Sequence, residues 1–170
     1  MLTDKGLWLP DKLNHKGIFT LELWRGKRLI KKARAENGIT TEGKNHLLDV
    51  VFHGTAAVAT WYIGLIDNSG FSSLLVGDTL ASHTGWTEIV PGTGYTGNRQ
   101  AWVEGAASGG SITSSSTATF PMLATYTVNG AFLCSVASGS TGTLITTGSF
   151  DNTIDVVSGD NLKVNYTISY

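Results

Sequence analysis

Residues 38–54 read GITTEGKNHLLDVVFHG, and they carry the one hydrophobic period in the chain that is typical of a helix. At 100° per residue, the apolar side chains among residues 47–52 share a broad arc, and polar side chains take the other side. Thr41 is a suitable N-cap, and Gly54 suits the left-handed position after the last turn. The pattern predicts a short helix over residues 41–53. A helix of about three turns is not stable alone in water, so we expect its apolar arc to lie on a neighbouring surface.

Strands predicted on both sides of this helix provide that surface. Residues 60–66, TWYIGLI, have the period of a strand. Residues 18–36 predict a β-hairpin, because apolar residues from Phe19 to Leu23 alternate with others and RGKR at 25–28 supplies a turn. Asn37-Gly38 predicts a second turn, which leads into the helix.

The chain after residue 106 is predicted to be a β meander. Turn signals such as Asn129-Gly130 and Asp151-Asn152 recur at intervals of roughly 8–12 residues, which is typical of sandwiches and barrels. The expected strands are residues 111–113, 117–120, 124–128, 131–136, 143–150, 154–157 and 161–169. The fold class we expect is mainly β: a β-sandwich or jelly-roll-like domain with one short helix.

The chain is expected to have two parts: an N-terminal arm with a basic β-hairpin (1–37) and a β-sandwich domain (38–170). A chain of 170 residues can bury roughly 70% of its unfolded surface. It needs no disulfide, and the single Cys134 among apolar neighbours predicts a buried, unreactive thiol. We expect no signal peptide, because the first thirty residues have no continuous apolar run, and no membrane association.

Charge is distributed unevenly along the chain. Residues 1–50 hold ten of the twelve Lys and Arg against six acidic residues, a net charge of +4. Residues 51–170 hold two cations and seven acidic residues, a net charge of −5, so the two parts give the overall −1. A basic front is compatible with nucleic-acid contact. We favour packing of this basic segment on an acidic neighbour in an assembly, because its cations follow a strand-like pattern.

No residue pattern predicts catalysis, a metal site or a cofactor. His46 and His53 lie two turns apart on the helix, roughly 10 Å, which is too far for joint metal ligation. Glu88 and Glu104 are candidates for a glycosidase acid pair, but most other carboxylates lie in turns, where they commonly cap the backbone. Two alternatives remain open for Trp61, Tyr62, Trp86, Tyr95 and Trp102: a sugar-stacking platform or, as we favour, the hydrophobic core.

Several stretches resemble small virion proteins encoded by tailed bacteriophages. They are residues 38–54, TWYIGLIDN at 60–68, DTLASHTGWTE at 78–88 and RQAW at 99–102. The resemblance covers about residues 38–170 and is most specific over 38–104. Residues 1–17 have no counterpart in it.

The resemblance implies a non-enzymatic virion structural protein, made in the bacterial cytoplasm and located on the capsid. The expected role is capsid decoration (cement): the protein binds the major capsid protein, forms homo-oligomers on the shell and makes no direct contact with nucleic acid. The alternative is a tail, baseplate or glycan-binding receptor module. The expected capsid or subunit contacts are Leu7, Trp8 and Leu9 in the arm and Arg25, Lys27 and Arg28 in the hairpin.

Overall fold

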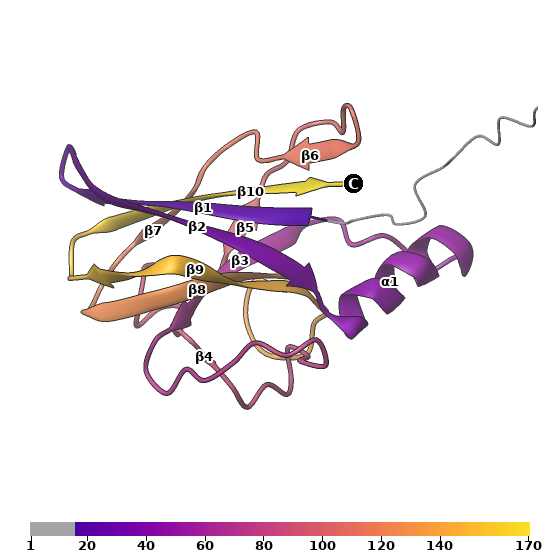
Figure 1. The fold of residues 1–170 in the computed structure, drawn as a ribbon, viewed down its shortest axis with the longest axis horizontal. Helices are drawn as coiled ribbons and strands as arrows, with labels where there is room; N and C mark the ends of the chain where they lie inside the picture. Colours follow the sequence, from indigo (N-terminus) through magenta and orange to yellow (C-terminus); the bar gives the residue numbers. More distant parts are fainter. Residues whose placement is uncertain (1–15) are drawn as a thin grey trace, which may run out of the picture.

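The computed structural model describes residues 16–170, which form a mainly β, sandwich-like domain with a single α-helix in this range (Figure 1). The fold class predicted from the sequence is therefore confirmed. The elements are β1 (Lys16–Arg25), β2 (Arg28–Ile39), α1 (Thr41–Phe52), β3 (Trp61–Asp67), β4 (Thr87–Glu88), β5 (Gln100–Trp102), β6 (Ser111–Thr113), β7 (Ala118–Pro121), β8 (Tyr126–Cys134), β9 (Leu144–Val156) and β10 (Asn161–Ser169).

The strands form one antiparallel path in the order β4-β3-β8-β9-β2-β1-β10-β6, with β5 added to β3 and β7 added to β10. Strand β2 joins the two halves of this path through only two residue pairs with β9, Gly38–Thr147 and Ile39–Thr146. We call β1, β2, β6, β7 and β10 the first layer, and β3, β4, β5, β8 and β9 the second layer. The two layers lie on either side of the main core (Figure 1).

Alternation along the strands explains this core. In β1, Phe19, Leu21 and Leu23 are buried, whereas the residues between them are exposed or half-buried. In β10, Leu162, Val164 and Tyr166 follow the same period of two. These side chains share one core cluster with apolar residues of β3, β8 and β9. The hairpin β1–β2 is thus part of the sandwich, and the expected division between residues 37 and 38 falls inside β2.

The second layer is buried on both faces at β3, at β8 and at the start of β9. Its inner face contributes to the main core, while Ile66, Phe132 and Cys134 point to the other side. The segment 68–99 covers that outer side with Leu80 and Trp86, and Phe71 and Leu74 pack at its margin. Strands buried on two faces have continuous rather than alternating apolar sequence, which is the pattern in β8.

Helix α1 is held at its first turn. The N-cap is Thr40, one residue before the predicted Thr41; its Oγ1 accepts a hydrogen bond from the Gly43 amide (2.9 Å) and donates one to the Leu144 carbonyl (2.5 Å). Glu42 accepts a hydrogen bond from the Leu144 amide at 2.8 Å. Gly43 lies so close to β9 that a Cβ there would meet the Ile145 carbonyl oxygen at 2.5 Å. Gly54 has the predicted left-handed conformation, with φ of 73°.

Three predicted turns are wrong. Asn37-Gly38 continues β2. Asn129-Gly130 lies inside β8, and Asp151-Asn152 lies inside β9, so four expected strands merge into two long ones. Between the pairs Val128–Ile154 and Gly130–Ser149 the register shifts, and one residue of β8 faces four of β9. Asn129 of β8 and the Asp151-Asn152 pair of β9 therefore lie in a bulge, which uses the same residue types as a turn.

Candidate interaction surfaces

Three of the five aromatic residues considered as a sugar platform belong to the core, whereas Trp61 and Tyr62 are only partly buried and pack against its margin. Trp86, Tyr95 and Trp102 are each no more than 5% exposed. Trp86 donates from Nε1 to Asp78 Oδ2 (3.0 Å), and Trp102 donates to Ser114 Oγ (3.0 Å), so both indole N–H groups have partners inside the domain. These three rings are not available for stacking on a glycan, and the core interpretation is correct for them.

The best-defined charged pair is Glu88 with Arg99. Arg99 Nε and Nη2 donate to the two carboxylate oxygens of Glu88 at 2.7 and 2.6 Å, and Nη1 donates to the Val136 carbonyl at 3.1 Å. The guanidinium also lies 5.4 Å from the ring centroid of Phe132. A carboxylate held in this two-point contact is neutralised by its partner. The pair joins two points of the segment 68–99, and Arg99 links this segment to Phe132 of β8 and to Val136 just after β8.

The predicted acid pair does not come together in one cavity. Glu88 lines a cavity beside His83 and Arg99, whereas Glu104 lines a different one beside Trp61 and Tyr170. The carboxylate geometry of a glycosidase is therefore missing for these two residues.

Two buried groups near Arg99 have perturbed acidity. Burial raises the pKa of the Tyr95 hydroxyl above its ordinary value, and the nearby Glu88 charge acts in the same direction. Burial also raises the pKa of the Cys134 thiol, whose Sγ donates to the Val136 carbonyl at 3.3 Å. A raised pKa keeps the thiol protonated and unreactive. Cys134 is buried, as the sequence predicted.

Two histidines, His46 and His83, act as packing groups. His46 makes an edge-on contact with Trp61, with ring centroids 5.5 Å apart. His83 stacks on Trp86 at 3.7 Å, and its Nδ1 lies 2.9 Å from the Trp86 carbonyl oxygen. Among residues 16–170, no group of three or more His, Cys, Asp or Glu side chains is arranged to hold a metal ion. No helix in the same range is long and apolar enough to cross a membrane.

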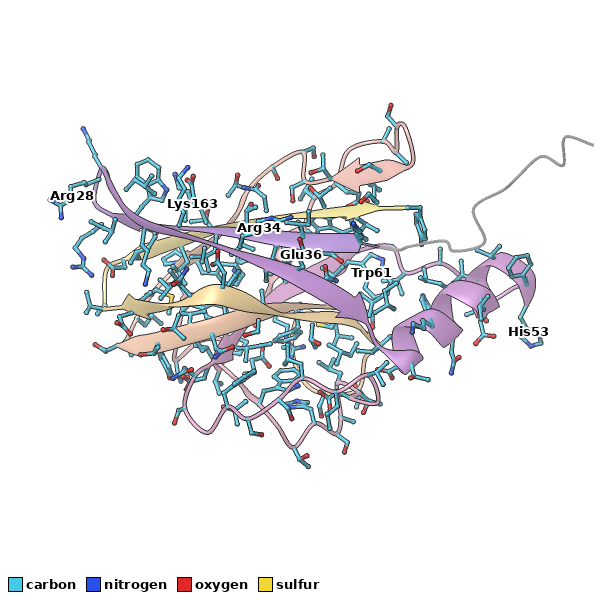
Figure 2. The ribbon with its side chains drawn as sticks, viewed as in Figure 1. Arg28, Arg34, Glu36, His53, Trp61 and Lys163 are labelled. Atoms are coloured by element: carbon cyan, nitrogen blue, oxygen red, sulfur yellow. The ribbon has the colours of Figure 1, made fainter. Side chains whose placement is uncertain are left out.

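The three cationic residues predicted as contacts lie at the hairpin tip, where one is paired within the domain and two are exposed. Arg25 donates from Nε and Nη2 to the carboxylate of Asp160 at 2.7 and 2.8 Å, so it has a structural partner. This guanidinium holds the pKa of Asp160 below its usual range. Lys27 and Arg28 are exposed at the tip. Figure 2 shows Arg28 at one end of the molecule and His53, which caps α1, at the opposite end.

The outer face of the first layer is a polar cross-strand network. Lys32 Nζ on β2 contacts Glu22 on β1 at 2.7 Å, and Trp24 Nε1 donates to the same carboxylate at 2.9 Å. Lys163 Nζ on β10 lies 4.6 Å from the ring centroid of Trp24. Much of the basic charge of the hairpin is therefore paired within the domain, as in a solvated sheet face.

Helix α1 exposes the side chains that were expected to be its buried arc. Leu48, Val51 and Phe52 are 55%, 67% and 80% exposed, and Gly43 is the single buried residue of the helix. Leu47 alone among the helix side chains packs against the main core. The expectation that the whole apolar arc lies on the sheet is wrong, because the first turn, His46 and Leu47 contact the second layer while Leu48, Val51 and Phe52 point away from it. Figure 1 shows α1 projecting from the end of the sandwich.

We call Leu48, Val51 and Phe52 the helix face. Sequence reasoning identified these residues as apolar but assigned them to the core, so it missed them as a surface. Leu7, Trp8 and Leu9, the other predicted contacts, lie outside the described residues.

In the comparisons with known proteins, no family model matches the chain, and no curated protein matches it.

Proposed function

We propose that this protein is a non-enzymatic virion structural protein of a tailed bacteriophage, which decorates the capsid and binds the major capsid protein. The observation that supports this role best is the helix face. Three large apolar side chains stand on a helix that is fixed to a rigid sandwich by its first turn. Contiguous exposed apolar side chains of this kind mark protein-binding surfaces. The resemblance in residues 38–104 includes this helix, and it is the reason for proposing a capsid protein as the partner.

The mechanism is mechanical. Each copy inserts its helix face into a groove of the shell, as an amphipathic helix does with its target. The tip cations Lys27 and Arg28, at the far end of the sandwich, reach an acidic neighbour. Each interface needs only ordinary size, because many copies bind one particle and adjacent capsomers are bridged. No step of this role requires a catalytic group.

The test is co-sedimentation of the purified protein with capsid shells that lack it. Wild type is expected to saturate the shells, with hundreds of copies per particle measured by gel densitometry. The variant Leu48→Ser/Val51→Ser/Phe52→Ser is expected to bind at least about tenfold more weakly, since each lost apolar contact costs about 1 kcal/mol or more. The control Leu123→Ser/Val157→Ser changes exposed apolar residues outside the helix and is expected to bind as wild type.

Three results would overturn the proposal in whole or in part. Absence of wild-type binding to shells removes the capsid as the partner, and a helix-face variant that binds normally removes the helix as the contact. If virions contain only a few copies per particle, the protein belongs to the tail or baseplate instead.

A further inference from the structure

An apolar cavity of about 280 Å³ opens between the two layers at the end of the sandwich that carries α1. Of the eleven described residues that line it, six are aliphatic and four are aromatic: Trp61, Trp102, Tyr166 and Tyr170. By comparison, an apolar cavity of roughly 150 Å³ is enough to bind benzene. The cavity therefore has room for a small organic molecule with one aromatic ring.

The eleventh lining residue is Glu104, which carries the single charge among them. Nine of the eleven acidic side chains in residues 16–170 accept a hydrogen bond within the domain, and the two exceptions are Asp49 and Glu104. Glu104 is also exposed, which places its carboxylate at the rim of the cavity rather than in its depth. A carboxylate without a partner in residues 16–170, beside apolar walls, is suited to a cation with an apolar body.

The backbone that carries Glu104 is held in place by the neighbouring chain. The Ser115 amide donates to the Val103 carbonyl at 2.8 Å, and Glu104 itself forms an isolated β-bridge with Ser114. Ser114 Oγ in turn accepts a hydrogen bond at 3.0 Å from Nε1 of Trp102, a lining residue. The carboxylate therefore stands on a paired stretch of backbone that is connected to one wall of the cavity.

We propose that this cavity binds a small organic cation, with an aromatic or branched alkyl body between the walls and an ammonium group at Glu104. Burial of the body removes apolar surface from water, and aromatic rings in the walls attract cations as well as apolar groups. An anion would be repelled by Glu104, and a neutral molecule would leave the carboxylate unpaired. The helix face and the hairpin tip contribute no residue to this lining, so the site does not depend on the capsid role.

The test uses the full chain and three probes of similar size: phenethylammonium, 2-phenylethanol and phenylacetate. Isothermal titration calorimetry at neutral pH measures the Kd of each. Phenethylammonium is expected to bind with a Kd on the order of 0.1–1 mM, as suits a fragment of this size. 2-Phenylethanol is expected to bind about fivefold more weakly, because it forms no ion pair with Glu104. Phenylacetate is expected to show no binding.

Three variants separate the charge from the cavity. Glu104→Gln is expected to reduce the affinity for phenethylammonium to that for 2-phenylethanol and to leave the affinity for 2-phenylethanol unchanged. Asp49→Asn, at the other carboxylate without a partner in residues 16–170, lies outside the lining and is expected to bind all probes as wild type does. Ile112→Trp enlarges a partly buried wall residue on β6 and is expected to abolish binding of both probes, with circular dichroism as the check of its fold.

Four results would overturn the proposal. Absence of phenethylammonium binding removes the site, and equal or tighter binding of 2-phenylethanol or phenylacetate removes the preference for a cation. A preference that survives Glu104→Gln shows that Glu104 is not the partner of the ammonium group. Unchanged binding by a folded Ile112→Trp variant places the probe elsewhere on the protein. None of these measurements uses capsid shells, so the outcome is independent of the proposed capsid binding.

Discussion

Strand β3 and helix α1 are close in sequence and each contains five large apolar or aromatic residues, yet the strand is buried on both faces and the helix projects into solvent. Ile63, Leu65 and Ile66 of β3 are fully buried, whereas Leu48, Val51 and Phe52 of α1 are more than half exposed. The strand has β8 beside it, the first layer on one face and the segment 68–99 on the other. The helix is attached mainly to β9 through Thr40, Glu42 and Gly43. The apolar pattern in a sequence shows which face of an element is suited to burial, but the rest of the fold determines whether another element packs on that face.

The largest expected effect follows from shortening a side chain that covers β3. Phe132 pairs with Gly64 of β3, is fully buried and lies 5.2 Å from the ring centroid of Trp86. Phe132→Ala is expected to lower the free energy of unfolding by about 3–5 kcal/mol, because it removes a core ring and leaves a cavity. Urea denaturation measures this change. A loss below about 1 kcal/mol would show that the segment 68–99 does not seal the outer face of the second layer.

The ion pair of Asp160 and Arg25 joins a buried group to an exposed one. The Asp160 carboxylate is as buried as the core residues of β3, whereas the Arg25 side chain is about as exposed as Leu48 of α1. The carboxylate also accepts a hydrogen bond from the Val157 amide at 3.0 Å. Asp160→Asn is expected to lower the free energy of unfolding by about 1–2 kcal/mol at pH 7, since hydrogen bonds to a charged group are lost.

The pH dependence of this loss has a defined sign. Arg25 holds the pKa of Asp160 below its ordinary value in the folded state. The contribution is therefore complete above the unfolded value of about 3.9 and disappears as the pH falls through the lower folded value. The free energies of unfolding of wild type and Asp160→Asn are expected to approach each other as the pH falls below about 4, and to meet once the pH is below the folded pKa of Asp160. Glu36→Gln, at an exposed ion pair with Arg34, is the control and should match wild type throughout. A gap that stays constant with pH would contradict the ion-pair account.

Gly43 tests how α1 is attached. In an exposed helix interior, Gly→Ala stabilises by about 1 kcal/mol. Here the added methyl group would meet the Ile145 backbone at 2.5–3.0 Å, so Gly43→Ala is expected to destabilise by about 1 kcal/mol. Asn45→Ala, on the exposed side of the same helix, should raise stability by a few tenths of a kcal/mol. Differential scanning calorimetry measures both changes. A stabilised Gly43→Ala would show that the first turn does not lie against β9.

The sequence predicted elements that depend on local chemistry. The hairpin β1–β2 and the strands at 111–113 and 161–169 have the predicted positions, because alternation and a local turn specify them. Asn129-Gly130 and Asp151-Asn152 were misassigned because a bulge in a long strand pair uses turn residues and is set by the partner strand. Asp151 illustrates this: its Oδ1 accepts from the Arg34 amide of β2, 117 residues away.

The predicted contact residues divide in the same way. Exposure of Lys27 and Arg28 followed from their place in a turn. The ion pair of Arg25 could not be predicted in this way, because its partner Asp160 lies 135 residues away in sequence. The helix face was identified as apolar but assigned to the wrong environment, since a hydrophobic period contains no information on what lies opposite it. The useful signal would have been the number of elements available to pack on the helix. One short helix attached to β9 by its first turn has more apolar side chains than this attachment can bury.

The smallest expected effect comes from making the Phe→Ala change on helix α1. Phe52→Ala deletes the same ring as Phe132→Ala, but Phe52 is 80% exposed. The free energy of unfolding is expected to change by less than about 0.5 kcal/mol, because little apolar area returns to water. Leu47→Ala on the same helix is the matched control: Leu47 packs against the main core, so its loss should cost about 1–2 kcal/mol. Both variants are measured by urea denaturation at one protein concentration. If Phe52→Ala destabilises as much as Leu47→Ala, the end of α1 is covered in solution by another part of the chain or by a second copy, and the contrast between helix and strand fails there.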